Sequence, residues 1–194
     1  MDKRTFLIGA GACAWTAAGA TAKAASPGAQ AMRVLTVAGR VTRANRGALD
    51  PVRDQLMKKH GVDFNRAYAF GMSDLLRMPS ERLEPTLEYD GKPHTLRGPA
   101  LVDVLEAAGV DLARNGHVGL RALDGYRVVL TLAQVRERGM ILATHLDDQP
   151  LAIGGLGPLW GLFDPARVPD LRDKPLAQRY ADCPWGTYFI DVSA

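Results

Sequence analysis

Tight-turn signals between short apolar segments are the feature that most restricts how this chain can fold. Asp90-Gly91 and Asp124-Gly125 each stand between segments in which apolar and polar residues alternate. Asp-Gly at such a place predicts a β-hairpin, because glycine readily adopts the positive φ that a two-residue turn needs. No apolar segment reaches the roughly 20 residues that a helix needs to cross a bilayer. The chain is therefore expected to form many short strands.

The remaining pattern distributes strands and short helices along the chain. Alternation and turn signals predict strands or hairpins over 33–41, 66–70, 85–98, 118–132, 140–152 and 185–192. Short helices are expected over 50–61, 72–79, 98–110 and 133–138. Together these elements predict a β-rich α+β fold.

Two of the expected helices have recognisable ends and buried faces. Asp50 is the predicted N-cap of the first helix, and its core-facing residues are expected to be Val52, Leu56 and Met57. In the helix over 98–110, Pro99 marks the start and Gly109 the end. Its predicted core-facing residues are Leu101, Val104 and Leu105.

The first 22 residues have the pattern of a secretory signal. Lys3 and Arg4 precede an apolar, alanine-rich stretch, which ends in small residues suited to signal peptidase. The "KRTFL" stretch resembles a twin-arginine export signal with lysine in place of the first arginine. We expect residues 1–22 to be removed, 23–32 to form a flexible leader and 33–194 to form a single periplasmic domain. A buried N-terminal helix and lipidation at Cys13 are the alternatives.

Charge and cysteine content exclude some functions. The whole chain has a net charge of +3, and loss of residues 1–22 would reduce it to +2. This charge is too small and too evenly spread to indicate nucleic-acid binding. Cys183 would be the one cysteine left, so the mature chain could form no intrachain disulfide. Its core must then provide the stability.

Several short motifs occur in an order that resembles a known family. They are "LRALDGY", "ILAT" followed by "DDQPL", and "GPLW", within a similarity that extends over residues 33–192. The chain resembles the small stand-alone proteins with the sulfite-oxidase fold, the oxidoreductase molybdopterin-binding domain proteins. This resemblance implies an α+β fold in which short helices accompany a β-rich, mixed or barrel-like sheet.

The resemblance also bears on metal binding. The larger family members are molybdenum enzymes in which a cysteine thiolate binds the metal, at a place that corresponds here to "LEPTLEYDGKPHTLRG" (83–98). That segment has no cysteine, and Cys183 is interpreted as a core residue. The histidines lack the close spacing of metal ligands: His60, His94, His117 and His145. Molybdenum, a metal site and catalytic residues are therefore not expected.

Five residues are candidates for a pterin site, which needs a flat apolar surface and fixed polar groups. Asp124 is expected to accept hydrogen bonds from the edge of the pterin ring, with Tyr126 beside it. The alternative is that Asp124 only forms the turn and Tyr126 only packs on the neighbouring strand. Trp160 is expected to stack on the ring or to lie in the core. Arg97 is expected to bind a phosphate tail or the ring carbonyl, or to lie at the surface. His145 is expected to point into the same cleft.

Other residues near these motifs have structural interpretations. Asp147 is expected in a turn, and Trp185 and Tyr188 are expected in the core or at a partner surface.

The resemblance implies a periplasmic pterin-binding protein whose ligand is a molybdopterin-like or a reduced pterin. Some small members of the family are thought to report a pterin to a membrane-bound signalling protein, either a cyclic-di-nucleotide enzyme or a histidine kinase. The first alternative is a molybdenum-cofactor oxidoreductase, or its subunit, in which no protein thiolate holds the metal. The second is an interaction module whose ancestral pocket is empty.

Overall fold

The strands β1 (Arg33–Gly39) and β11 (Thr187–Ser193) bring both ends of the described chain into one sheet. The computed structural model describes residues 32–194. The two strands pair in parallel, with Val37 opposite Ile190. Both strands were predicted from the sequence, and both are confirmed.

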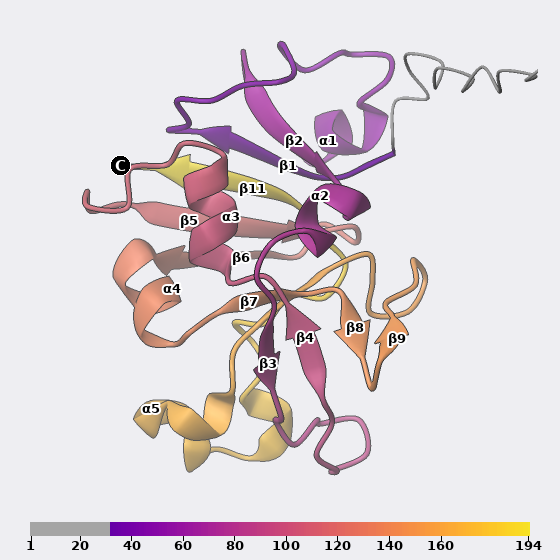
Figure 1. The fold of residues 1–194 in the computed structure, drawn as a ribbon, viewed down its shortest axis with the longest axis vertical. Coiled ribbons are helices and arrows are strands. Elements are labelled where there is room, and N and C mark those ends of the chain that lie inside the picture. Colours follow the sequence, from indigo (N-terminus) through magenta and orange to yellow (C-terminus); the bar gives the residue numbers. More distant parts are fainter. Residues whose placement is uncertain (1–31) are drawn as a thin grey trace, which may run out of the picture. The chain divides into compact units, whose positions relative to one another are not determined.

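Three further strands complete this sheet, which runs in the order β2-β1-β11-β5-β6 (Figure 1). Strand β2 (Ala67–Gly71) pairs with β1, and β5 (His117–Ala122) pairs with β11, both antiparallel. Strand β6 (Arg127–Thr131) pairs with β5 through the turn at Asp124-Gly125, where Gly125 has a φ of +93°. The hairpin predicted from Asp-Gly is therefore confirmed.

Two smaller sheets hold the remaining strands. One is four-stranded, with β3 (Glu81–Leu83), β4 (Leu96–Gly98), β8 (His145–Leu146) and β9 (Gln149–Pro150) in that order. In the turn between β8 and β9, Asp147 and Asp148 both have positive φ, which confirms the predicted turn.

The third sheet pairs β7 (Ile141–Ala143) with β10 (Trp160–Leu162). In the described part of the chain, the sheets are open and none closes on itself. The expected mixed α+β architecture is confirmed, whereas the barrel-like closure is not observed. The strand pairing explains why, since β2 and β6 each have a strand partner on one side only.

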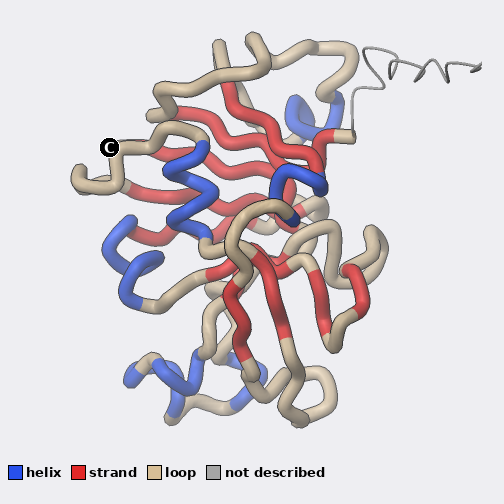
Figure 2. Tube along the Cα trace, viewed as in Figure 1, coloured by secondary structure: helices blue, strands red, loops and turns tan. Residues whose placement is uncertain are grey.

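The helices are short, as Figure 2 shows. They are α1 (Gln55–Lys59), α2 (Met72–Leu76), α3 (Leu101–Ala107), α4 (Leu132–Glu137) and α5 (Pro169–Arg172). Short 3₁₀ helices cover Pro165–Arg167 and Leu176–Gln178. None of the helices in residues 32–194 combines the length and the apolar character needed to cross a membrane.

Helix α3 supplies part of the main core. Its predicted core-facing residues are all completely buried, in the same cluster as Leu120 of β5 and Ile190 of β11: Leu101, Val104 and Leu105. Helix α4 begins where the Thr131 hydroxyl accepts a hydrogen bond from the Gln134 backbone N–H at 3.1 Å. Both helices were predicted at these places.

The first helix differs from its prediction. Asp50 does cap the turn before α1, since its Oδ1 accepts hydrogen bonds from the backbone N–H groups of Val52 and Arg53. However, Val52 is 76% exposed and Leu56 is also exposed, whereas Met57 is buried. The helix is little more than one turn long and lies at the surface, so that it buries one residue instead of a full apolar face.

The hairpin predicted over 85–98 is also different. The strands that pair are β3 and β4, and residues 84–95 form a long loop between them. A bridge between Thr86 and Pro93 closes this loop, and Gly91 has a φ of +68° at its tip. Asp90-Gly91 does form a turn, but within a loop. The loop carries Glu88 and Tyr89.

The predicted signal (1–22) and most of the leader (23–32) lie outside the described residues. The described residues belong to one compact unit, Ala31–Ala194.

Candidate functional site

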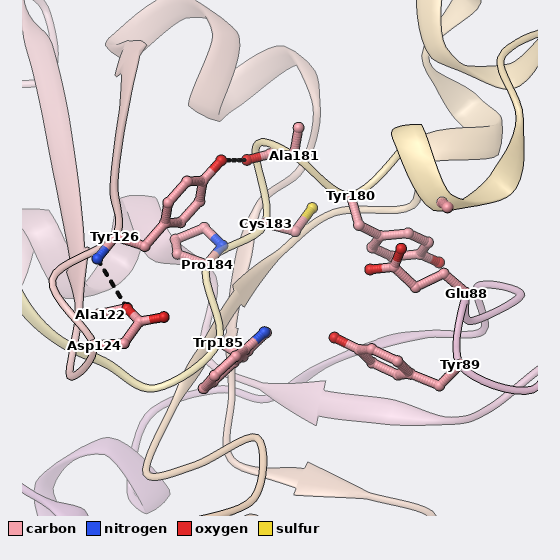
Figure 3. Close-up of a pocket in the computed structure, with 11 residues that line it drawn as sticks. Glu88, Tyr89, Ala122, Asp124, Tyr126, Tyr180, Ala181, Cys183, Pro184 and Trp185 are labelled. Atoms are coloured by element: carbon pink, nitrogen blue, oxygen red, sulfur yellow. Dashed lines mark hydrogen bonds between the residues drawn. The ribbon is translucent and has the colours of Figure 1, made fainter.

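A pocket of about 210 Å³ lies where three distant parts of the chain meet (Figure 3). These parts are the turn between β5 and β6, the loop 84–95, and the segment 177–185 before β11. We call it the aromatic pocket. The side chains that matter for its chemistry are Glu88, Tyr89, Asp124, Tyr126, Tyr180 and Trp185.

The β5–β6 turn fixes two of these side chains. Asp124 Oδ1 accepts a hydrogen bond from the Tyr126 backbone N–H at 2.9 Å, which stabilises the turn. The Tyr126 hydroxyl donates to the carbonyl of Ala181 at 2.8 Å, as Figure 3 shows. The turn is thereby joined to the segment 177–185, and both form one wall of the pocket.

The opposite wall of the pocket, the loop 84–95, is also joined to the segment 177–185. The Tyr180 hydroxyl donates to the Thr86 carbonyl at 2.7 Å, which holds the loop 84–95 in place. The backbone N–H of Leu123 donates to the Gly186 carbonyl at 3.0 Å, directly after Trp185. Each part of the pocket is therefore fixed by a hydrogen bond to residues near the C-terminal strand.

Exposed aromatic rings distinguish this pocket from the rest of the described surface. Tyr89 is 56% exposed, Tyr126 50% and Trp185 40%. Among the Phe, Tyr and Trp residues in 32–194, these three are the exposed ones, and all three line the aromatic pocket. Apolar surface that gathers at one place is typical of binding sites, because exposing it to water is unfavourable.

The charged groups that line the pocket are both carboxylates. Asp124 uses one oxygen in its turn, and the Glu88 side chain has neither a hydrogen bond nor an ion pair among the described residues. Burial raises the pKa of Tyr89, and the negative charge of Glu88 raises it further. Burial also raises the pKa of Tyr180. At neutral pH, both phenols are therefore hydrogen-bond donors.

Cys183 lines the pocket and does not have the properties of a metal ligand. Its side chain is buried, and burial raises the pKa of the thiol to about 12. A thiol in that state is protonated at neutral pH, whereas metals bind the thiolate. The interpretation of Cys183 as a core residue is confirmed. In residues 32–194, no three His, Cys, Asp or Glu side chains are grouped as a metal site would need.

The predicted site residues separate into two groups. Asp124 and Tyr126 lie together at the aromatic pocket. Trp160 is 1% exposed and donates from Nε1 to the Cys183 carbonyl at 2.9 Å, so its ring has no free face for a ligand. It packs beneath the pocket, with its ring centre 6.3 Å from that of Tyr89 and 6.2 Å from that of Tyr180. The expectation that Trp160 stacks on a ligand is not met.

Arg97 and His145 lie elsewhere, directly opposite each other on β4 and β8. Arg97 pairs with Asp148 at 3.4 Å, and His145 Nδ1 lies 2.8 Å from the Thr144 hydroxyl. Burial, followed by the positive charge of Arg97, lowers the pKa of His145. Neither residue lines the aromatic pocket, because the pairing of β4 with β8 holds both in the four-stranded sheet.

Sequence reasoning missed three residues that line the aromatic pocket: Glu88, Tyr89 and Trp185. Trp185, expected in the core or at a partner surface, provides an exposed ring, while Tyr188 is buried as expected. Glu88 and Tyr89 come from the segment 83–98, where the resemblance implies the metal-binding cysteine of the larger enzymes. This correspondence could have identified Glu88 and Tyr89 as candidates, because it marked the segment 83–98 as part of the cofactor site of the larger enzymes.

Comparisons with known proteins address the fold. No protein-family model matches the chain, and no curated protein matches it. A solved structure, the sulfane dehydrogenase SoxCD from Paracoccus pantotrophus, is similar over 82% of this chain, with a TM-score of 0.52 and 13% sequence identity. The chain spans 37% of the length of that protein. At this identity the similarity shows the fold, an α+β fold that this chain shares with part of a dehydrogenase.

Proposed function

We propose that this protein binds a small flat heteroaromatic ring of the pterin class in the aromatic pocket. The observation that carries the proposal is the gathering of exposed rings: Tyr89, Tyr126 and Trp185, from three separate parts of the chain, all line one pocket. A flat ligand gains contact area on such surfaces, and stacking adds about 0.5–1.5 kcal/mol for each aromatic pair.

The polar groups suit the edge of a pterin. The ring carries an amino group and a neighbouring N–H on one edge, and a carboxylate can accept from both. Asp124 and Glu88 each have an oxygen without a partner among the described residues. The pocket volume of about 210 Å³ is below the range of roughly 300–1,000 Å³ common for drug-sized ligands. A two-ring heterocycle is therefore favoured over a larger molecule.

The sequence resemblance and the fold also support a ligand of the pterin class. The sequence resembles molybdopterin-binding domains, and the structure shares its fold with part of a dehydrogenase. The alternative function, a molybdenum-cofactor oxidoreductase or a subunit of one, draws on this likeness. The described residues do not fit a thiolate-held metal, because the Cys183 thiol is buried and protonated.

We further propose that binding takes place in the periplasm and is reported to a membrane-bound signalling protein. The signal-like pattern of residues 1–22 supports this location. The resemblance to small pterin-binding family members supports the sensor role.

The test is a calorimetric titration of the protein with 6-hydroxymethylpterin. Binding is expected for the wild type, with affinity reduced at least about tenfold in Trp185→Ala and in Asp124→Asn, because each loses a contact with the ring. Matched controls are Val129→Thr, exposed on β6 outside the pocket, and Asp170→Asn, exposed on α5. These should bind like the wild type. No heat of binding in the wild type, or equal affinity in all variants, would contradict the proposal.

A further inference from the structure

We infer that the aromatic pocket accepts an uncharged or cationic pterin and rejects one that carries a phosphate or a carboxylate. This inference rests on the proposed function and specifies the ligand class. Its basis is the charge of the pocket wall: Glu88 and Asp124 line it, and no Lys, Arg or His does. The wall is negative although the chain as a whole has a net charge of +3.

Three arginines that contact segments next to the pocket are held by other groups. Arg138 pairs with Asp182 at 2.7 Å, and Arg179 donates from Nε to the Lys174 carbonyl at 2.7 Å. The Nη1 of Arg121 lies 3.5 Å from the Gly125 carbonyl, behind the turn that carries Asp124. None of the three guanidinium groups lines the pocket, so none is placed to bind an anion there.

The effect of Glu88 on its neighbours supports the same conclusion. Its carboxylate is half-buried and raises the pKa of Tyr89, second only to burial. It also raises the pKa of Tyr180, after the larger effects of burial, Cys183 and Asp164, whereas Arg179 lowers it. Its field thus acts on groups on both sides of the pocket and disfavours negative charge there. The phosphate of a molybdopterin would meet this field, and no Lys, Arg or His lines the pocket to pair with it.

Two arginines without a carboxylate partner lie at another cavity. Arg40 and Arg66, which donate to backbone carbonyls, line a separate space of about 380 Å³ together with Arg114. Among the described residues, neither Arg40 nor Arg66 has an ion pair. The protein therefore has cationic groups that an anion could meet, but they are not at the aromatic pocket.

The test compares two ligands that share one ring, the neutral 6-hydroxymethylpterin and the anionic pterin-6-carboxylate. Calorimetry at low ionic strength should give at least a tenfold weaker affinity for the carboxylate, because of repulsion by Glu88 and Asp124. Added salt should reduce the ratio of the two affinities, since the pocket is open to solvent. Glu88→Gln should also reduce this ratio, whereas the control Glu106→Gln, exposed on α3, should leave it unchanged.

The outcomes separate this inference from the proposed function. If both pterins bind equally, or the carboxylate binds more tightly, the charge selection is wrong and ring binding stands. An unchanged ratio in Glu88→Gln that folds like the wild type also overturns the selection. If neither pterin binds, the proposed function fails and the inference fails with it.

Discussion

Trp160 and Trp185 lie opposite each other in a β-bridge, but their surroundings give them different roles. Trp160 is buried, and its indole N–H is satisfied by the Cys183 carbonyl. Trp185 is exposed at the aromatic pocket. The sequence could not separate the two, because each tryptophan stands among apolar, Gly and Pro residues and burial depends on what the fold places around them.

Substitution of the two tryptophans should change the free energy of unfolding to different extents. Trp160→Ala should lower the free energy of unfolding by about 3–5 kcal/mol, because it leaves a cavity and an unpaired buried carbonyl. Trp185→Ala should change it by less than about 1 kcal/mol. Urea unfolding followed by circular dichroism measures both. A Trp185→Ala variant less stable than Trp160→Ala would contradict the assignment of Trp160 to the core.

At the scale of elements, an ion cluster links the loop 84–95 to the turn between β8 and β9. His94 Nδ1 lies 2.6 Å from Asp147 Oδ2 in the β8–β9 turn, and His94 Nε2 lies 3.1 Å from Asp90 Oδ2. Hydrogen bonds to Asp147 and then Asp90 raise the pKa of His94, and the same contacts lower the pKa of both carboxyls. The cluster lies next to Tyr89, so it helps to place one ring of the aromatic pocket.

These pKa shifts predict how stability depends on pH. The contribution of His94 is complete below the usual histidine pKa of 6.5 and is lost as pH rises through its raised value. The contributions of Asp90 and Asp147 are complete above the usual value of 3.8 and are lost as pH falls through their lowered values. The cluster is therefore most stabilising between these two usual values.

The comparison of the wild type with His94→Gln isolates the effect of the histidine. Urea unfolding at about pH 5.5 and about pH 9 should show that the wild type loses more stability at the higher pH than the variant does. Equal losses in both proteins would show that His94 is not coupled to the two carboxylates in solution.

Turn chemistry made some elements predictable, and packing decided the others. The β5–β6 hairpin follows from Asp124-Gly125, because the turn is a local property of those residues. Asp90-Gly91 also forms a turn, but the paired strands lie outside the predicted range because β3 pairs with β4 around a long loop. Arg97 and His145 were expected near Asp124, whereas the pairing of β4 with β8 places them in a different sheet. Such pairings between distant segments leave no signal in the local sequence.

In the molecule as a whole, the parallel pair β1–β11 connects the first and last strands of the described chain. Gly39 ends β1 with a φ of +88°, and a Cβ there would lie 2.1 Å from the Val192 carbonyl oxygen. Both strands were predicted from the sequence, but their pairing appears only in the structure. The fold shared with part of a dehydrogenase agrees with the α+β class expected from the sequence.

The close approach at Gly39 predicts a large effect on global stability. Gly39→Ala should lower the free energy of unfolding by more than about 2 kcal/mol, since it combines an unfavourable φ with a clash against the β11 backbone. Gly47→Ala is the matched control, because a Cβ at that position meets no atom within 4 Å. It should lie within about 0.5 kcal/mol of the wild type. Thermal unfolding of both variants tests the prediction, and equal midpoints would contradict the β1–β11 geometry.

The central claim, that the exposed rings of the aromatic pocket hold a flat ligand, is tested most directly by NMR. In a ¹⁵N–¹H spectrum of the protein titrated with 6-hydroxymethylpterin, the indole resonance of Trp185 should shift strongly, because the ring current of the ligand acts on it at contact distance. The indole resonance of buried Trp160 should move much less. If the Trp185 resonance stays in place at saturating pterin, the aromatic pocket is not the binding site.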